Sequence, residues 1–375
     1  MRSISDTVAR LAAFRDLAPG ARAADPMRRL DTLTGFGTNP GALVAKHHVP
    51  AGLRPGAALV VVLHGCTQTA DGYDQGAGWS TLADRDGFAV LFPEQTRANN
   101  PNLCFNWYMS EDVRREGGEA QSIRQMIAAM ILAHDLDPAR AYITGLSAGG
   151  AMTSVMLATY PELFAGGAII AGLPFGSAHN VPQAFDRMRG HGGPDDAELA
   201  ALVREASGGH QGDWPTVSIW HGTADRTVAL SNMDRIAAQW RALHGTGSAP
   251  DRIEAVDGYS RSIWHGADGR VAIQQHEIAG MGHGTPIDPN GPDRLGRAAP
   301  HMLDVGIAST ALIARSWGIA SKPFWNARAA PPRRHEPAAE RAAADRTAKS
   351  VPRRDGVGGV QKVIEDALRA AGLMK

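Results

Sequence analysis

Three residues of this sequence have the types and the chain order that acyl transfer by a serine requires: Ser147, Asp225 and His283. The reaction needs a nucleophilic hydroxyl, a base that takes its proton, and an acid that orients the base. Ser147 lies in Gly145–Gly149, a Gly-x-Ser-x-Gly pentapeptide that follows a short β-branched run. A strand that turns sharply into a helix exposes a serine hydroxyl at the turn, so this stretch predicts a nucleophile elbow.

The candidate acid and base each follow an apolar segment with the character of a strand. Thr216–Trp220 precedes Asp225, and Val271–Ile278 precedes His283. In α/β-hydrolases the nucleophile, the acid and the base come in this order, each on a loop after a strand. Three strand-end loops that carry these residue types in this order are stronger evidence than the pentapeptide alone.

Other residues compete for the roles of acid and base. Asp257 and Asp268 are alternative acids, but the His-Gly-x-x-Asp run before Val228 favours Asp225. His221 lies in the same loop as Asp225, and we interpret it as a residue that shapes this loop. Three more histidines are weaker candidates for the base, because they lie inside a strand or lack a preceding strand and glycine: His265, His276 and His301.

A tetrahedral intermediate also needs hydrogen-bond donors for its oxyanion. The backbone N–H of Ala148, directly after the nucleophile, is one expected donor. The other is expected in the loop after the apolar run Ala58–Leu63, at Cys66, where Gly65 allows a close approach. We interpret His64, at the start of this loop, as a structural residue.

The chain has 2 cysteines, Cys66 and Cys104, each beside one of the expected site loops. One interpretation is a disulfide that ties the asparagine-rich loop around Cys104 to the oxyanion loop. The other is a pair of reduced thiols, as a cytoplasmic protein would have. Neither is expected to be the nucleophile, since a serine occupies the elbow.

Four aromatic residues are candidates for an apolar wall that holds an acyl or hydroxyacyl unit: Trp79, Trp107, Tyr108 and Phe175. For each of them, burial in the hydrophobic core is the competing expectation. No metal-ligand set, phosphate-binding loop or dinucleotide fingerprint is recognisable, so we expect no metal and no cofactor.

The hydrophobic pattern indicates the elements that position these loops. Short continuous apolar runs are typical of strands buried on both faces, and residues 119–134 show apolar residues at helical spacing. Strands are expected at 58–63, 88–92, 139–144, 167–172, 216–220 and 271–278, and helices at 79–86, 119–134, 147–160, 231–244 and 302–317. This alternation predicts an α/β-hydrolase fold, a doubly wound and mostly parallel sheet flanked by helices.

Composition divides the chain into four parts. Residues 1–40 are expected to be a peripheral segment, and 41–326 the α/β-hydrolase catalytic domain, with an edge strand at 42–49. Residues 327–356, rich in arginine and proline, are expected to be a disordered basic linker. Residues 357–375 are expected to form a short amphipathic helix.

The composition is ordinary for a globular protein: 375 residues, 43% hydrophobic and 20% charged. A formal net charge of +0 gives no electrostatic reason to expect nucleic acid or an anionic membrane as a partner. No apolar run approaches the ~18 residues of a transmembrane segment, and no signal peptide is recognisable. A cytoplasmic protein, or one exported by another route, is the direct expectation. Nothing in the sequence indicates an oligomeric state.

Six motifs together resemble the esterase family of poly(3-hydroxybutyrate) depolymerases, of the short-chain-length type with the lipase box in mid-domain. They are Leu63–Gln68, Pro93–Gln95, Cys104–Trp107, Gly145–Gly150, His221–Asp225 and Gly282–Gly284. The resemblance implies an α/β-hydrolase domain that hydrolyses polyester or short acyl esters, with Ser147, Asp225 and His283 as catalytic triad. It also implies an extracellular setting, as in many members.

Two features depart from the pattern of this family. No signal peptide is recognisable, and only a short helix follows the linker, where a polymer-binding domain would help a depolymerase to hold a crystalline surface by avidity. An esterase that acts on oligomers, amorphous polymer or other carboxylic esters therefore also fits, and feruloyl and acetylxylan esterases share related motifs. A non-catalytic binding protein with the α/β-hydrolase fold is the alternative from a different class.

Overall fold

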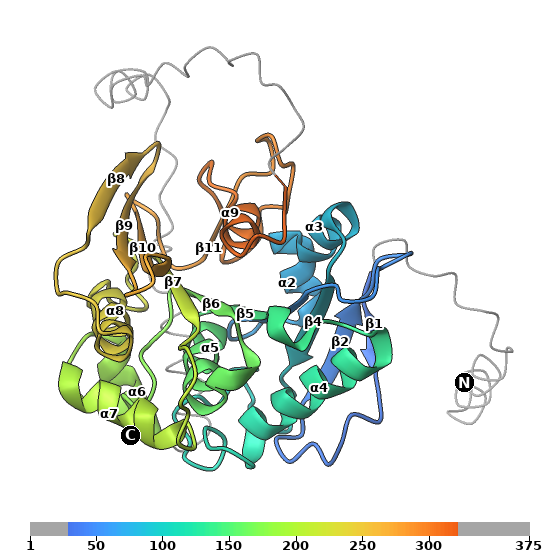
Figure 1. The fold of residues 1–375 in the computed structure, drawn as a ribbon, viewed down its shortest axis with the longest axis horizontal. Coiled ribbons are helices and arrows are strands. Elements are labelled where there is room, and N and C mark those ends of the chain that lie inside the picture. Colours follow the sequence, from blue (N-terminus) through green and yellow to red (C-terminus); the bar gives the residue numbers. More distant parts are fainter. Residues whose placement is uncertain (1–28, 322–375) are drawn as a thin grey trace, which may run out of the picture.

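The computed structural model describes residues 29–321, which form a central sheet with helices on both faces (Figure 1). The linker and the C-terminal helix expected at 327–356 and 357–375 lie outside the described residues. The strands are β1 Asp31–Leu33, β2 Val44–His48, β3 Leu59–Leu63, β4 Ala89–Glu94, β5 Ala141–Leu146, β6 Gly166–Ile170, β7 Thr216–Gly222, β8 Arg252–Val256, β9 Tyr259–His265, β10 Val271–Ile278, β11 Thr285–Ile287 and β12 Met302–Asp304. The helices are α2 Ala70–Ala77, α3 Trp79–Asp86, α4 Gly118–His134, α5 Ala148–Thr159, α6 Val181–Met188, α7 Asp196–Ala206, α8 Ser231–His244 and α9 Ser309–Ser316.

Within the described residues the main sheet has ten strands, in the order β1-β2-β4-β3-β5-β6-β7-β10-β9-β8. The strands from β4 to β10 in this order run parallel to one another, and antiparallel strands extend both edges. β3 shows the physical reason, since every one of its residues is buried, as expected for an apolar run covered on both faces. The predicted α/β-hydrolase architecture is confirmed.

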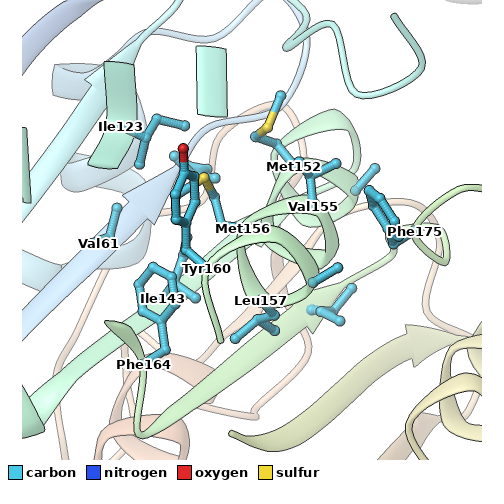
Figure 2. Close-up of a cluster of buried hydrophobic side chains, with 14 of the residues drawn as sticks. Val61, Ile123, Ile143, Met152, Val155, Met156, Leu157, Tyr160, Phe164 and Phe175 are labelled. Carbon is cyan, nitrogen blue, oxygen red and sulfur yellow. The ribbon is translucent and has the colours of Figure 1, made fainter. Parts of the chain in front are cut away.

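The hydrophobic core has two layers, because successive residues of a strand point to opposite faces of the sheet. On one face, Leu59, Val61 and Leu63 pack with α4, α5, α7 and α8. Figure 2 shows the part of this layer around α5. On the other face, Val60 and Val62 pack with α2, α3 and α9. The sheet between these layers is a rigid base, and the loops after β3, β5, β7 and β10 all leave its carboxyl edge.

Two predictions about single elements are wrong. The helix expected at 302–317 is shorter, because β12 pairs in parallel with β11 and Gly306 has a positive φ of 73°, so that α9 begins only at Ser309. The strand expected at 42–49 is β2, but it is not at the edge of the sheet. Asp31–Leu33 pairs with it as β1, inside the segment that was expected to be peripheral.

The described part of the chain ends shortly after α9, close to the expected end of the catalytic domain at residue 326. The boundaries of the four parts stay predictions. None of the helices between residues 29 and 321 is long and apolar enough to cross a membrane.

Candidate active site

Ser147 occupies the turn between β5 and α5, where the elbow motif predicts it. Its backbone has φ 57° and ψ −117°, a conformation that residues other than glycine rarely adopt. Such a conformation costs about 1–3 kcal/mol, and the surrounding structure must hold it in place. Strain of this kind is concentrated at functional sites, where it aims a side chain in a direction that a relaxed turn would not allow.

The glycines of the pentapeptide make room for this turn. A Cβ on Gly145 would lie 2.4 Å from the carbonyl oxygen of Gly149, and one on Gly149 would lie 2.4 Å from that of Leu63. Both neighbours are backbone atoms, which cannot swing aside as a flexible side chain can. The end of β3 therefore packs directly against the elbow, which places Ser147 beside the loop that carries Cys66.

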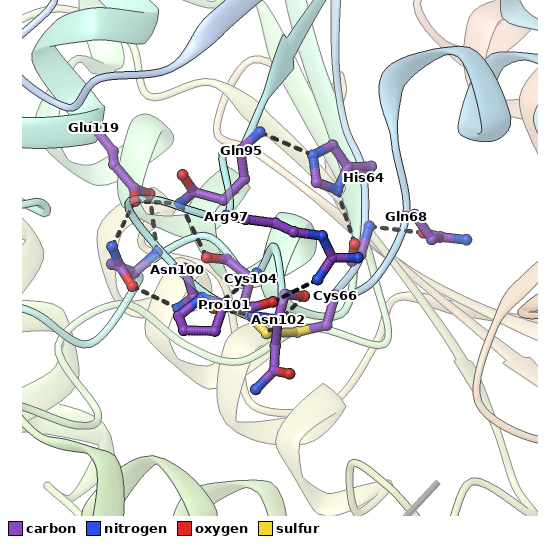
Figure 3. The surroundings of a disulfide bond; sticks show 12 residues. His64, Cys66, Gln68, Gln95, Arg97, Asn100, Pro101, Asn102, Cys104 and Glu119 are labelled. Atoms are coloured by element: carbon purple, nitrogen blue, oxygen red, sulfur yellow. Dashed lines mark hydrogen bonds between the residues drawn. A yellow bond between two sulfur atoms is a disulfide. The ribbon is translucent and has the colours of Figure 1, made fainter. Parts of the chain in front are cut away.

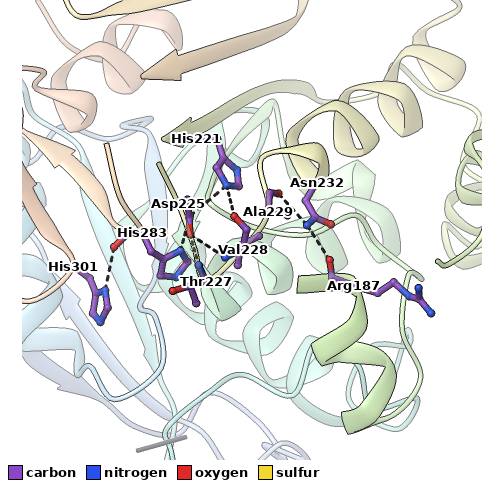
Figure 4. Close-up of polar contacts among 9 residues, drawn as sticks. All are labelled: Arg187, His221, Asp225, Thr227, Val228, Ala229, Asn232, His283 and His301. Carbon is purple, nitrogen blue, oxygen red and sulfur yellow. Dashed lines mark hydrogen bonds and ion pairs between the residues drawn. The ribbon is translucent and has the colours of Figure 1, made fainter. Parts of the chain in front are cut away.

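Asp225 and His283 form a direct hydrogen bond at the same edge of the sheet (Figure 4). His283 Nδ1 lies 2.7 Å from Asp225 Oδ2. The other carboxylate oxygen, Oδ1, accepts hydrogen bonds from the N–H groups of Thr227 and Val228 at 2.8 and 2.9 Å. The Asp225 side chain is fully buried, whereas that of His283 is 9% exposed. This arrangement fixes the imidazole through Nδ1 and leaves Nε2 free for chemistry.

The surroundings of Asp225 keep its carboxyl group ionised. Burial alone would raise the pKa of Asp225, but hydrogen bonds from His221, His283 and the Val228 N–H outweigh burial and hold the pKa well below its usual range. His221 Nε2 lies 2.9 Å from the Val228 carbonyl oxygen and 3.3 Å from Asp225 Oδ2. His221 thus shapes the Asp225 loop, as its position in the sequence indicates.

The loops that carry Asp225 and His283 pack backbone against backbone. A Cβ on Gly222 would lie 2.1 Å from the Met281 carbonyl oxygen, a distance that no side chain tolerates. The Ala224 N–H donates to the same oxygen at 3.0 Å. Backbone contacts between the two loops therefore hold the acid and the base together, in addition to the contact between their side chains.

The competing histidines have other surroundings. His276 is buried and stacks on Trp220 with ring centroids 3.7 Å apart, and burial lowers its pKa to about 3. His265, at the end of β9, faces an aspartate that precedes β8. His301 contacts the base itself: its Nδ1 donates to the His283 carbonyl oxygen at 3.1 Å, a contact that the sequence did not indicate. It comes 18 positions after His283, beyond a turn-rich stretch without a recognisable motif.

Cys66 and Cys104 are joined by a disulfide, with their Cα atoms 4.2 Å apart (Figure 3). The Thr67 N–H donates to the Asn102 carbonyl oxygen at 2.7 Å, so the two loops are fastened at neighbouring positions. The Gly65 N–H donates to a glutamine side chain of its own loop. Within residues 29–321, no protein acceptor is found for the Cys66 N–H, the donor that the sequence indicates.

Trp79 does not belong to a substrate wall, and its prediction is wrong. Its ring stacks against Trp317 with centroids 6.2 Å apart, in the layer formed by α2, α3 and α9. Trp317 stacks in turn on Tyr142, near the start of β5, whereas Ser147 follows the far end of that strand. The position of Trp79 is explained by the burial of its large aromatic surface between α3, α9 and the sheet.

The other three aromatic residues belong to the opposite layer, which also contains the elbow helix α5. Trp107 and Phe175 are each 8% exposed, so both contribute mainly to the core. Tyr108 is only partly buried and meets Trp107 edge to face, with centroids 5.4 Å apart. A substrate wall that contains these residues stays a prediction. Within the described part of the chain, no group of three or more His, Cys, Asp or Glu is arranged to hold a metal ion.

Glu119 is a buried acid near this site that the sequence did not single out. It lies in the first turn of α4 with no exposed surface. Burial and the charge of Asp112 raise its pKa to about 8. Its hydrogen-bond partners precede it by 13 to 24 positions in an irregular loop, and no sequence pattern indicates such contacts.

Comparison with known proteins gives a consistent result. Residues 46–257 match the family model described as Esterase PHB depolymerase. Poly(3-hydroxyalkanoate) depolymerase C of Paucimonas lemoignei is 43% identical to this chain over 291 residues, which cover 77% of this chain and 70% of that protein. Feruloyl esterase B of Talaromyces stipitatus is 31% identical over 267 residues, covering 69% and 73% of the two chains. Acetylxylan esterase A of Emericella nidulans is 31% identical over 262 residues, covering 67% and 82%.

A solved structure agrees with this result. The acetyl xylan esterase from Aspergillus awamori superimposes with a TM-score of 0.66 and is 26% identical. The match covers 78% of this chain and 99% of that structure.

Proposed function

Because this chain belongs to the esterase PHB depolymerase family, we propose that it cleaves poly(3-hydroxybutyrate)-type polyester, or its oligomers, through an acyl-enzyme on Ser147. The chain is a carboxylic-ester hydrolase of the α/β-hydrolase fold. The observation that carries the proposed mechanism is the Asp225–His283 pair, held on the same sheet edge as the strained serine. The 43% identity to a poly(3-hydroxyalkanoate) depolymerase supports the polyester substrate.

In the first step, His283 Nε2 takes the proton of the Ser147 hydroxyl while the serine oxygen attacks the ester carbonyl carbon. Asp225 stabilises the imidazolium that forms, because its ionised carboxylate is hydrogen bonded to Nδ1. The tetrahedral intermediate then breaks its bond to the alcohol oxygen. The alcohol leaves with the proton that His283 held, and the acyl group remains on Ser147.

In the second step, water attacks the acyl-enzyme by the same route, and the acid is released. In both steps the carbonyl oxygen becomes an oxyanion. We propose that the N–H groups of Ala148 and Cys66 donate hydrogen bonds to it. Ala148 is the first residue of α5, where an N–H has no acceptor within the helix and the helix dipole favours negative charge. Removal of one such donor typically lowers kcat by about 10²–10³-fold.

An esterase for aromatic or acetyl esters of plant polysaccharides is the second candidate. It is favoured by the 31% identity to a feruloyl esterase and to an acetylxylan esterase, and by the fold shared with an acetyl xylan esterase. Both candidates use the same site and mechanism, so only the substrate separates them. We also propose that the protein is extracellular, because the Cys66–Cys104 disulfide would persist in an oxidising compartment.

The test compares initial rates on four substrates: amorphous poly(3-hydroxybutyrate), 3-hydroxybutyrate trimer, methyl ferulate and acetylated xylan. We expect kcat/KM for the trimer to exceed that for methyl ferulate and that for acetylated xylan by at least about tenfold. A tenfold ratio corresponds to about 1.4 kcal/mol of transition-state discrimination. The opposite ranking would replace the polyester assignment by the second candidate. Ser147→Ala should abolish every one of these activities.

A further inference from the structure

The carboxyl group of Glu119 collects hydrogen bonds from one loop, the segment 95–106 that contains Cys104 (Figure 3). Its Oε1 accepts from Gln95 Nε2 at 2.6 Å, Asn106 Nδ2 at 2.8 Å and Asn99 Nδ2 at 3.1 Å. Its Oε2 accepts from the Asn106 N–H at 2.9 Å. Both ends of the loop are therefore fixed to one buried group on α4.

The first connection from Glu119 to the oxyanion loop runs through Gln95 and His64. The Gln95 N–H donates to His64 Nε2 at 3.1 Å, so the proton of this imidazole is on Nδ1. His64 Nδ1 then donates to the Gly65 carbonyl oxygen at 2.8 Å. The Gly65 carbonyl belongs to the same peptide unit as the Cys66 N–H, and this contact therefore orients the proposed oxyanion donor.

The second connection runs through the disulfide. Gln95 Nε2 also donates to the Cys104 carbonyl oxygen at 3.0 Å, and Cys104 is bonded to Cys66. Asn106 extends the network, because Asn100 Nδ2 donates to its side-chain oxygen at 2.9 Å while the Asn100 oxygen accepts the Cys104 N–H at 3.3 Å. The peptide that precedes Cys66 and the side chain of Cys66 are thus held by chains of contacts that begin at one carboxyl group.

No cation in the described residues compensates Glu119. The charge that acts on Glu119 is that of Asp112, which has the same sign and whose Oδ1 accepts the Glu119 N–H at 3.2 Å. A buried acid without a cation is costly in stability. What Glu119 contributes at this position is the fixed geometry of the loop 95–106, whose donors it binds.

We propose that Glu119 is a positioning residue that fixes the Cys66 N–H in the geometry required to bind the oxyanion. The inference rests on the proposed acyl-enzyme mechanism and adds to it a residue that touches neither the substrate nor the triad. If it is correct, loss of Glu119 weakens binding of the tetrahedral intermediate more than binding of the ground-state ester.

The test is Glu119→Gln, whose amide keeps one acceptor oxygen but turns an N–H₂ toward the Asn106 N–H. We expect kcat for p-nitrophenyl butyrate to fall by about 10–100-fold with KM within about threefold, as for a misplaced catalytic group. The inhibition constant of a trifluoromethyl ketone, which forms a tetrahedral adduct with a catalytic serine, should rise by the same factor as kcat/KM falls. A change in stability alone would not produce this match.

Asp74→Asn is the matched control. Asp74 is also a buried carboxyl, and it accepts hydrogen bonds from the N–H and hydroxyl of Ser80, but it lies in the layer on the other face of the sheet. This variant should lose thermal stability and keep kcat within about twofold of the wild type, because its carboxyl group accepts hydrogen bonds from Ser80 rather than from the loops that carry Cys66, Cys104 or the triad. Equal kcat and inhibitor affinity in the two variants would overturn the inference.

Failure of the proposed function and failure of the positioning role give different results. If the wild type itself hydrolyses no ester, the proposed function fails; if the wild type is active and Glu119→Gln matches Asp74→Asn, only the positioning role fails. Should Glu119→Gln not fold, Asn99→Ala takes its place, because Asn99 is half-buried and donates one of the bonds to Glu119. An unchanged kcat in that variant would also overturn the inference.

Discussion

At the scale of single residues, the contact between Asp225 and His283 determines which nitrogen of the imidazole carries the proton. A neutral imidazole carries one N–H, and a carboxylate beside Nδ1 keeps that proton there. Nε2 is then an acceptor, as a general base must be. The lowered pKa of Asp225 follows from the donors around it and favours the ionised carboxylate.

Asp225→Asn tests this role. The amide nearly preserves the shape of the side chain, but it no longer provides the charge that selects the tautomer and stabilises the imidazolium. We expect kcat to fall by about 10⁴-fold with a small change in KM, as in other serine triads. Asp251→Asn is the control, since Asp251 also contacts a histidine Nδ1, that of His265 at 3.1 Å, but at an exposed site. A loss of less than tenfold in Asp225→Asn would contradict the assignment.

Glu119 makes a pH-dependent contribution to stability whose sign follows from its pKa. The pKa of about 8 in the folded state exceeds the 4.5 of an unperturbed glutamate, so between these values the folded protein holds a proton that the unfolded chain has released. The contribution of Glu119 to the unfolding free energy should therefore fall as the pH rises from 4.5 to 8, by up to about 1.4 kcal/mol per pH unit.

Urea unfolding of the wild type and Glu119→Gln at several pH values measures this contribution. Asp112 and Tyr108 face the same group and are present in both proteins, so the difference between the two unfolding free energies reports Glu119 together with its coupling to these two residues. Between pH 5 and 8 the unfolding free energy of the wild type should fall relative to that of Glu119→Gln. The slope should approach that of one bound proton, about 1.4 kcal/mol per pH unit. A difference that is independent of pH would show that Glu119 is already ionised at the acid end.

At the scale of elements, the strands and helices with strong hydrophobic patterns are predictable and the irregular ones are not. β3, β5, β6 and β10 are continuous or alternating apolar runs, and the sheet places them as the sequence indicates. The strand β9 was not predicted, although Asp257-Gly258 between β8 and β9 is a typical hairpin turn. The helix expected at 302–317 overlooks Gly306, whose left-handed conformation separates β12 from α9.

A substitution at Gly222 tests how closely the end of β7 must approach the loop after β10. Gly222→Ala places a methyl group against the Met281 carbonyl oxygen, and the loop of His283 must move to accept it. We expect a loss of about 1–3 kcal/mol in unfolding free energy and a fall in kcat of at least about tenfold. Gly247→Ala is the control, because its Cβ has space and the glycine lies in a distant loop. Wild-type activity in Gly222→Ala would contradict the close packing of the two loops.

At the scale of the whole molecule, the sheet turns residues far apart in the chain into one site. The order Ser147, Asp225 and His283 predicts three neighbouring loops, because each follows a parallel strand, and the structure brings Asp225 and His283 together. The contacts of Glu119 and His301 were not predictable, because they depend on how irregular loops pack, and no periodicity reports this. Trp79 was misplaced for a related reason: an aromatic residue near a site loop in sequence can face the opposite layer of the core.

The central claim is that Ser147 is the nucleophile that carries the acyl group. The most direct measurement is covalent labelling with diethyl p-nitrophenyl phosphate, followed by mass spectrometry of the digested protein. We predict one diethylphosphoryl group per chain, on Ser147, with loss of activity in proportion to labelling and no label on Ser147→Ala. A label on another residue, or full esterase activity in Ser147→Ala, would contradict this account.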